Sequence, residues 1–197
     1  MSKDKINLEI LKILVLATQP DQGDLIEAGL KSVGIQSSTQ TCLPTKAPAE
    51  LLSGIDAFII ALSSENDAEL TNVIALAKTA DCPVALFLDS GINANIGEII
   101  GAGICTVVID GLSPDRIPHI LEATIHRYNK VRGLQIQLEN VKTELEERKL
   151  VERAKAILIE QRQISEPTAY KLLQRAAMNQ NCRIANIAQT IIVANQV

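Results

Sequence analysis

Four short runs of mostly apolar residues, separated by longer amphipathic stretches, constrain the fold of this chain more than any other feature of its sequence. They are Lys12–Ala17, Asp56–Leu62, Val84–Leu88 and Ile104–Ile109, and a weaker run covers Ile35–Thr39. Strands that are apolar along their whole length are buried on both faces, as in parallel sheets covered by helices. The pattern therefore predicts a parallel sheet of five strands.

Amphipathic stretches lie between and after these runs, and their apolar residues recur at helical spacing. They predict helices over residues 21–33, 47–52, 67–80 and 93–100, and a fifth helix that opens at Ser113-Pro114-Asp115, where Ser113 is the expected N-cap. Five strands alternating with five helices within residues 1–126 predict an α/β flavodoxin-like, doubly wound domain.

A single very long helix is expected after this domain. Between Pro118 and Pro167 the chain has no proline and one glycine, Gly133, which favours a helix over residues 115–162. Five apolar residues in this stretch follow the 3-4 spacing of a coiled-coil seam. They are Val131, Leu134, Leu138, Val141 and Leu145. We expect residues 127–150 to form a coiled-coil linker that makes a homodimer; the alternative is a helix packed on its own domain.

The end of the chain predicts a small three-helix bundle over residues 151–197. The long helix breaks near Gln163, and Ser165 is the expected cap of a second helix, with Glu166 and Pro167 in its first turn. A third helix begins near Arg183. The apolar residues expected to face the core are Ala169, Leu172, Leu173 and Ala176 in the second helix, and Ile184, Ile187, Ala188, Ile191 and Ile192 in the third.

Charge is distributed unevenly along the chain. Residues 1–126 hold 7 basic and 16 acidic residues, a net charge of −9, whereas residues 127–197 hold 12 and 7, a net charge of +5; together they give the −4 of the whole chain. An acidic part joined to a basic part indicates that only the basic part meets a polyanion. A solvated basic helix without a ligand is the alternative.

Signatures of catalysis or of a metal site are missing from the sequence. It contains neither GxGxxG nor GxxxxGKS/T, and no recognisable Ser/His/Asp set. The four cysteines (Cys42, Cys82, Cys105 and Cys182) form no CxxC pair, and His119 and His126 lack a third ligand, so we expect buried free thiols and no metal. We therefore expect no enzyme and no cofactor. A cytoplasmic protein is expected, because no signal peptide or membrane-spanning run is present.

The order and lengths of the predicted strands resemble the receiver domains of bacterial response regulators. A working receiver has two acidic residues after its first strand that hold Mg²⁺, a phosphoacceptor Asp at the end of the third, Thr or Ser at the end of the fourth and Lys at the end of the fifth. These positions fall on Ala17, Thr18, Ala61, Leu88 and Asp110. Alanine cannot accept a phosphoryl group and neither Ala17 nor Thr18 offers a carboxylate to Mg²⁺. The resemblance thus implies a pseudo-receiver that is not controlled by phosphorylation.

The last 50 or so residues, 148–197, are similar to the ANTAR domain, the RNA-binding module of transcription antiterminators. The motifs that carry the similarity are R-A-K-A-I-L at 153–158, S-E-P-T-A-Y-K-L-L-Q-R-A-A-M at 165–178 and R-I-A at 183–185. The order of receiver-like domain, long helix and ANTAR domain resembles antiterminators of the NasT/AmiR type. That resemblance implies a regulator of nitrate and nitrite assimilation genes, released by a nitrate-sensing, NasS-like partner protein.

Candidate RNA contacts are the cations and polar side chains of this module. They are Arg153, Lys155, Arg162, Tyr170, Arg175, Asn179 and Arg183. Cations neutralise phosphates, and aromatic or guanidinium planes stack with unpaired bases. Lys155, in the R-A-K motif, is the strongest of these candidates. Tyr170 could instead pack in the bundle, Ala177 and Met178 are expected to pack rather than to bind, and Arg183 could satisfy a helix end.

The resulting hypothesis is an RNA-binding transcription antiterminator that binds hairpin loops in leader RNA as a homodimer. One rival is a protein-interaction module in which the basic charge is incidental. The other rival is a response regulator controlled by phosphorylation.

Overall fold

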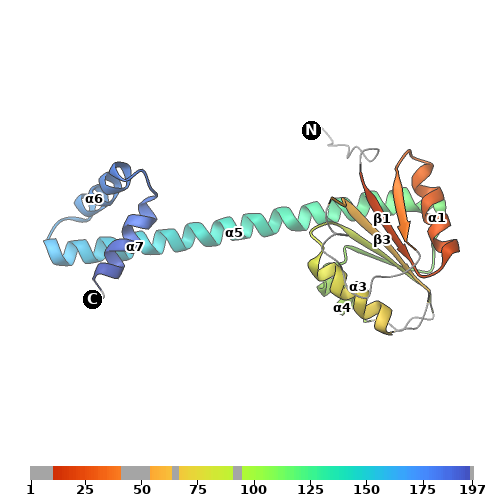
Figure 1. Ribbon diagram of the computed structural model, residues 1–197. Coiled ribbons are helices and arrows are strands. Elements are labelled where there is room, and N and C mark those ends of the chain that lie inside the picture. Colours follow the sequence, from red (N-terminus) through yellow and green to blue (C-terminus); the bar gives the residue numbers. More distant parts are fainter. Residues whose placement is uncertain (1–10, 41–53, 64–66, 91–94, 196–197) are drawn as a thin grey trace. The chain divides into compact units, whose positions relative to one another are not determined.

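A single five-stranded parallel sheet, ordered β2-β1-β3-β4-β5, forms the centre of the first part of the chain in the computed structural model (Figure 1). The structure describes residues 11–40, 54–63, 67–90 and 95–195, so the helix expected at 47–52 lies outside the described residues. The strands are β1 (Ile13–Ala17), β2 (Ser37–Gln40), β3 (Ala57–Leu62), β4 (Val84–Leu88) and β5 (Thr106–Ile109). This strand order is that of the flavodoxin-like fold and confirms the predicted fold class.

Helices cover both faces of the sheet because its central strands are apolar on both sides. Alternate strand residues such as Val15 and Ile59 pack against α1 (Pro20–Lys31) and the first turns of α5 (Ile117–Arg162). Their neighbours, such as Leu16 and Ile60, pack against α3 (Asp67–Thr79) and α4 (Ile96–Gly101). The carboxyl ends of all five strands therefore meet at one edge, where ligands bind in folds of this kind.

Two local boundaries differ from the sequence-based expectations. Helix α4 begins at Ile96 instead of 93, because the Asn95 side chain accepts hydrogen bonds from the backbone N–H groups of Gly97 and Glu98 and caps the helix there. The long helix is preceded by a short 3₁₀ turn, Pro114–Arg116, and the side chain of Ser113 makes no capping hydrogen bond.

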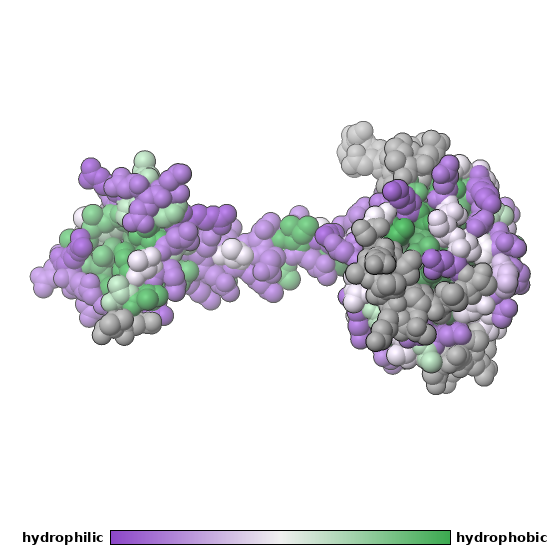
Figure 2. Space-filling view, viewed as in Figure 1, coloured by the Kyte–Doolittle hydropathy of each residue, from purple (hydrophilic) through white to green (hydrophobic). Residues whose placement is uncertain are grey.

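The predicted long helix is present: α5 is 46 residues long, begins two residues later than expected, and passes from one compact unit, Met1–Arg132, into the next, Gly133–Val197. Its seam residues, from Val131 to Leu145, are 52–62% exposed, and apolar patches interrupt the mostly hydrophilic surface of the helix (Figure 2). No described residue covers them. An apolar stripe with this exposure favours the predicted contact with a partner over the alternative of a helix packed on its own domain.

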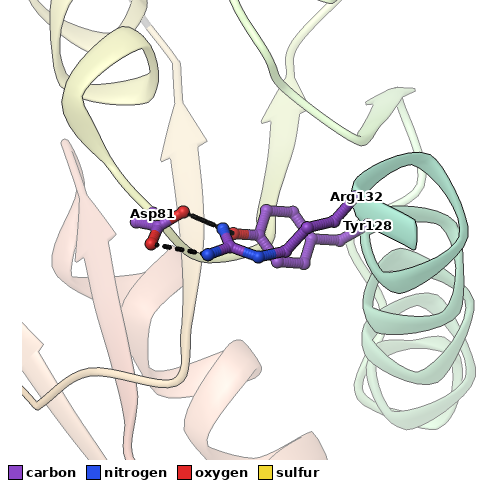
Figure 3. A network of polar contacts seen from close by, with 3 residues as sticks. All are labelled: Asp81, Tyr128 and Arg132. Carbon is purple, nitrogen blue, oxygen red and sulfur yellow. Dashed lines mark hydrogen bonds and ion pairs between the residues drawn. The ribbon is translucent and has the colours of Figure 1, made fainter. Parts of the chain in front are cut away.

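The first unit holds α5 by a polar network at the point where the unit ends. Both Arg132 and Tyr128 reach from α5 to Asp81, in the loop between α3 and β4 (Figure 3). The Tyr128 hydroxyl donates to Asp81 at 3.0 Å, Arg132 pairs with both carboxylate oxygens, and its guanidinium lies 5.8 Å from the Tyr128 ring centre. The hydrogen bonds from Arg132 and Tyr128 lower the pKa of Asp81.

The second unit is a three-helix arrangement of the end of α5 with α6 (Glu166–Asn179) and α7 (Ile184–Ala194). Each helix contributes apolar residues at helical spacing to one core: Val151, Ala154 and Leu158; Ala169, Leu173 and Ala177; Ile187, Ala188 and Ile192. The predicted bundle is present, with one correction. Leu172 is 36% exposed, so the stripe of α6 runs through Ala177 instead.

Within the described parts of the chain, no helix combines the length and apolar character needed to cross a bilayer. The three cysteines in these parts, Cys82, Cys105 and Cys182, are free and half-buried, whereas Cys42 lies outside them.

Candidate nucleic-acid interface

Lys155 is an internal side chain of the helical unit. It is only 7% exposed, and its Nζ lies 2.8 Å from Glu152 and 2.7 Å from Glu166. Hydrogen bonds to these carboxylates raise the pKa of Lys155, and the same contact lowers the pKa of Glu166. Because its charge is paired with two carboxylates, one of them in α6, Lys155 ties α5 to the first turn of α6. This geometry argues against the expectation that Lys155 contacts RNA directly.

A groove of about 790 Å³ opens between α6, from Tyr170 onwards, and the start of α7. Tyr170, Gln174 and Met178 line it from α6, each four residues after the last, so they share one face of that helix. Its remaining lining residues are Ala177 of α6, then Asn181, Cys182 and Arg183 of the α6–α7 turn, and Ile184 and Asn186 of α7. The groove thus combines an aromatic ring, several amides and one cation, with no acidic residue.

The α6 side chains at the ends of this row, Tyr170 and Met178, face solvent. Tyr170 is 45% exposed, which argues against the alternative that it packs in the core. Met178 is 75% exposed, so the expectation that it packs is wrong, whereas Ala177 is buried as expected. The difference follows from the direction of α6, whose buried face runs through Ala169, Leu173 and Ala177.

Arg183 stands immediately before α7 and pairs with Glu147 of α5, with 2.9 Å between Nη1 and Oε1. At the other end of α7, the Gln161 side chain of α5 donates a hydrogen bond to the Asn195 side chain, immediately after α7. Both ends of α7 are therefore joined to α5, which fixes one wall of the groove. The Arg183 side chain remains 75% exposed in its ion pair, so a ligand can reach it.

The other predicted contacts are exposed but lie outside the groove. Arg153, Arg162 and Arg175 take part in no ion pair among the described residues, and Asn179 is the last residue of α6. From Pro167 onwards the sequence contains three cations, Lys171, Arg175 and Arg183, and no acidic residue. A polyanion approaching α6 and α7 would therefore meet positive charge there.

The predicted degenerate phosphorylation residues come together at the carboxyl edge of the sheet. Ala17 pairs with Ala61 in register, and both are fully buried, while Leu88 is buried at the end of β4. In place of a metal-binding acid, Thr18 contacts the Ser63 hydroxyl at 3.0 Å. The Asp110 carboxylate accepts a hydrogen bond from the backbone N–H of Ser90 at 2.8 Å. No cluster of three or more His, Cys, Asp or Glu suited to a metal occurs among the residues that the structure describes.

Comparison with known families and proteins gives the helical unit its identity. The family model of the ANTAR domain matches residues 139–192. This chain carries an ANTAR domain. The ANTAR domain comprises the second half of α5, α6 and most of α7, and it includes the whole groove.

Two curated relatives are similar to part of the chain. The transcriptional regulatory protein PdtaR of Mycobacterium tuberculosis is 36% identical over 78 residues, which cover 40% of this chain and 38% of PdtaR. The nitrate regulatory protein of Klebsiella oxytoca is 36% identical over 64 residues, 32% of this chain and 16% of that protein. The matches thus span well under half of either relative.

A solved structure supports the fold of the first unit. A Burkholderia pseudomallei protein described as related to pilus assembly superposes with a TM-score of 0.51 at 14% identity, covering 64% of this chain and 96% of its own. At this identity the likeness concerns the fold alone.

Sequence reasoning missed Gln174, Asn181 and Asn186 as groove residues. Gln174 follows Tyr170 by one helical turn, and that spacing could have indicated a shared face. Nothing in the sequence places Asn186 opposite them, because this depends on how α7 packs against the other helices.

Proposed function

We propose that this protein is a transcription antitermination regulator whose ANTAR domain binds hairpin loops in leader RNA. The ANTAR domain itself carries the proposal, since its α6–α7 surface is accessible and, beyond Glu166, free of acidic residues. The names of two relatives, a transcriptional regulatory protein and a nitrate regulatory protein, are in accord with it. Binding would keep a terminator stem from forming, in the cytoplasm where leader RNA is made, and requires no cofactor.

Affinity for RNA would come mainly from exposed cations, and recognition from the groove. Arg153, Arg162 and Arg175 are exposed and suited to contacts with phosphates. Unpaired bases in a loop present edges and faces that an A-form helix hides, so a loop suits a groove lined by amides and an aromatic ring. The proposal leaves Lys155 out of this interface, because its charge is already paired with Glu152 and Glu166.

Control by phosphorylation is not part of the proposal. The residues at the strand ends offer two alanines and a leucine where a receiver needs a metal-binding acid, a phosphoacceptor and a hydroxyl. We propose instead that a ligand-sensing partner protein holds the receiver-like domain, as in regulators of the NasT type, and that the ligand is nitrate. This last step rests on the subgroup resemblance and on the name of the Klebsiella oxytoca relative.

We also propose that the protein forms a homodimer along α5. The exposed seam residues repeat every three and four positions, which is the spacing that a second helix covers. Apolar stripes of this length are seldom left in water.

The test is a gel-shift assay with a hairpin from the leader of the operon that contains this gene, at two salt concentrations. We expect binding that weakens steeply with salt. Arg175→Gln should reduce the slope of log affinity against log salt concentration by about 0.7–0.9 if one phosphate contact is lost. Lys78→Gln is an equal change of charge at an exposed position of α3 and should leave this slope unchanged. Absence of binding at low salt by folded protein would favour the rival, a protein-interaction module.

Incubation with a small phosphodonor and Mg²⁺ tests whether the receiver-like domain can be phosphorylated. We expect no aspartyl phosphate on the intact chain by mass spectrometry. A stable phosphorylated aspartate would restore the rival reading of a phosphorylation-controlled regulator.

A further inference from the structure

The groove between α6 and α7 has a wall suited to a flat aromatic ligand. Tyr170 and Met178 both line the groove and are largely exposed, at 45% and 75%. Two exposed apolar side chains on one helix face, two turns apart, leave a surface on which a planar ring can stack. Stacking on a tyrosine suits any nucleobase, since every base has a π-face.

Three amide side chains surround this wall without an evident structural task. Gln174, Asn181 and Asn186 line the groove, and their side-chain amides make no hydrogen bond to any of the residues that the structure describes. Each amide offers a donor and an acceptor side by side, which is the pattern presented by the edge of a base. These amides can therefore form hydrogen bonds with the edge of a base while the Tyr170 ring stacks on its face.

Charge in the groove favours an anionic ligand such as a nucleotide over a cationic or neutral planar compound. Arg183 is the only charged lining residue, and its partner Glu147 lies outside the groove. An exposed ion pair of this kind contributes little stability, so a phosphate can replace the carboxylate at small cost. The aromatic ring, the amides and the cation of this groove match the face of a base, its edge and the phosphate of one nucleotide.

We propose that the α6–α7 groove seats a single unstacked base of the RNA loop, stacked on Tyr170, with its edge bound by the amides and its phosphate by Arg183. This inference rests on the proposed RNA binding and specifies where sequence is read. A duplex does not satisfy it, because stacked and paired bases expose neither face nor full edge. Asn179, one of the RNA contacts predicted from the sequence, lies outside the groove, and the amides that line the groove are those of Gln174, Asn181 and Asn186.

The chain provides its own reporter for this stack. It contains two tyrosines and no tryptophan, so in the Tyr128→Phe protein Tyr170 is the sole source of intrinsic fluorescence above that of phenylalanine. Titration of this variant with the leader hairpin should quench the emission of Tyr170 at the same concentrations that give the gel shift. Unchanged emission at saturating RNA would overturn the stack.

A double-mutant cycle tests the contact itself. Each loop base of the hairpin is replaced in turn by an abasic site, and affinities are measured for the wild type, Tyr170→Phe and Tyr170→Leu. At one position we expect wild-type affinity to fall roughly 5- to 100-fold, in line with the stacking of one base. The abasic site at that position should not lower the RNA affinity of Tyr170→Leu further. Tyr170→Phe keeps the ring, so its affinity should fall as that of the wild type does.

A second test compares alanine variants of two amide residues of α7, one inside the groove and one outside it. Asn186→Ala, in the groove, should weaken binding and relax the preference at that same loop position, whereas Gln189→Ala, exposed elsewhere on α7, should not. If the wild type binds RNA with its salt slope intact but no groove variant matters, the base site is wrong, the groove serves another partner such as a peptide, and RNA binding stands. If the wild type does not bind RNA at all, both proposals fall.

Discussion

Leu173 and Leu172 are adjacent leucines that the structure places in opposite environments, and truncating each tests the packing of the ANTAR domain. Leu173 is 1% exposed in the core formed by all three helices, whereas Leu172 is 36% exposed. Replacing a buried leucine by alanine removes its burial and leaves a cavity, at a cost of about 2–5 kcal/mol. Leu172→Ala should cost less, because about a third of its surface is already in water and its removal leaves no closed cavity.

The expected consequence for this domain is large. Its core contains five apolar side chains bigger than alanine, Val151, Leu158, Leu173, Ile187 and Ile192. Domains of this size seldom have more than about 3–5 kcal/mol of stability from their core. Leu173→Ala should therefore lower the unfolding midpoint of the unit by about 10 °C or more, or unfold it entirely.

Hydrogen exchange measured by mass spectrometry resolves the effect by region. Peptides from α6 and α7 should lose protection in Leu173→Ala, and peptides from the sheet strands β1, β3 and β4 should not, because they belong to the other compact unit. The packing described here would be refuted if Leu172→Ala deprotected these helices as much as Leu173→Ala, since the two residues would then share one environment.

Three further predictions follow from particular contacts. Leu138→Glu introduces a charge into the exposed seam and should convert the proposed dimer into a monomer in analytical ultracentrifugation; an unchanged mass would exclude α5 as the interface. Lys155 lowers the pKa of Glu166, so this ion pair stabilises the fold above the ordinary carboxyl pKa of 4.5 and is lost as the pH falls through the lowered value. The difference in thermal stability between wild type and Glu166→Gln should thus shrink as the pH drops below 4.5, and a constant difference would contradict the assignment. Burial, with Asp81 and Asp56 nearby, raises the pKa of Cys82 to about 11, so near pH 8.5 its thiolate fraction, and its rate of alkylation by iodoacetamide, should be roughly 100-fold below those of a free thiol; alkylation as fast as in unfolded protein would contradict this.

The sheet and its helices could be predicted from the sequence because the signals are local and strong. The runs around β1, β3 and β4 are apolar on both faces, which is typical of parallel strands in a sheet covered by helices on both sides. The end of α5 at Arg162 and the start of α6 at Glu166 were also predictable, since Ser165 and Pro167 are residues that begin helices. The start of α4 was missed by three residues because a capping asparagine decides it.

The candidate site was only partly predictable. Tyr170 and Arg183 were identified from composition and from family motifs, and the structure brings them into one groove. For Lys155 the sequence shows the neighbour Glu152, one helical turn away, but it gives no sign of the second carboxylate, Glu166, which comes from another helix. Met178 was misjudged for the related reason that one residue of shift along a helix turns a side chain by about 100°, from core to solvent.

The sequence by itself determined that the chain has an acidic α/β part and a basic helical part, and that the strand ends lack the residues of a working receiver. These properties depend on residue type and on periodicity, which are local. Only the tertiary structure decided which cations are free and which amides face one groove. Lys155 is neutralised by Glu166, eleven residues away, and Asn186 reaches the groove because α7 packs beside α6. Such contacts join residues distant along the chain, and they exist only once the helices have packed against a shared core.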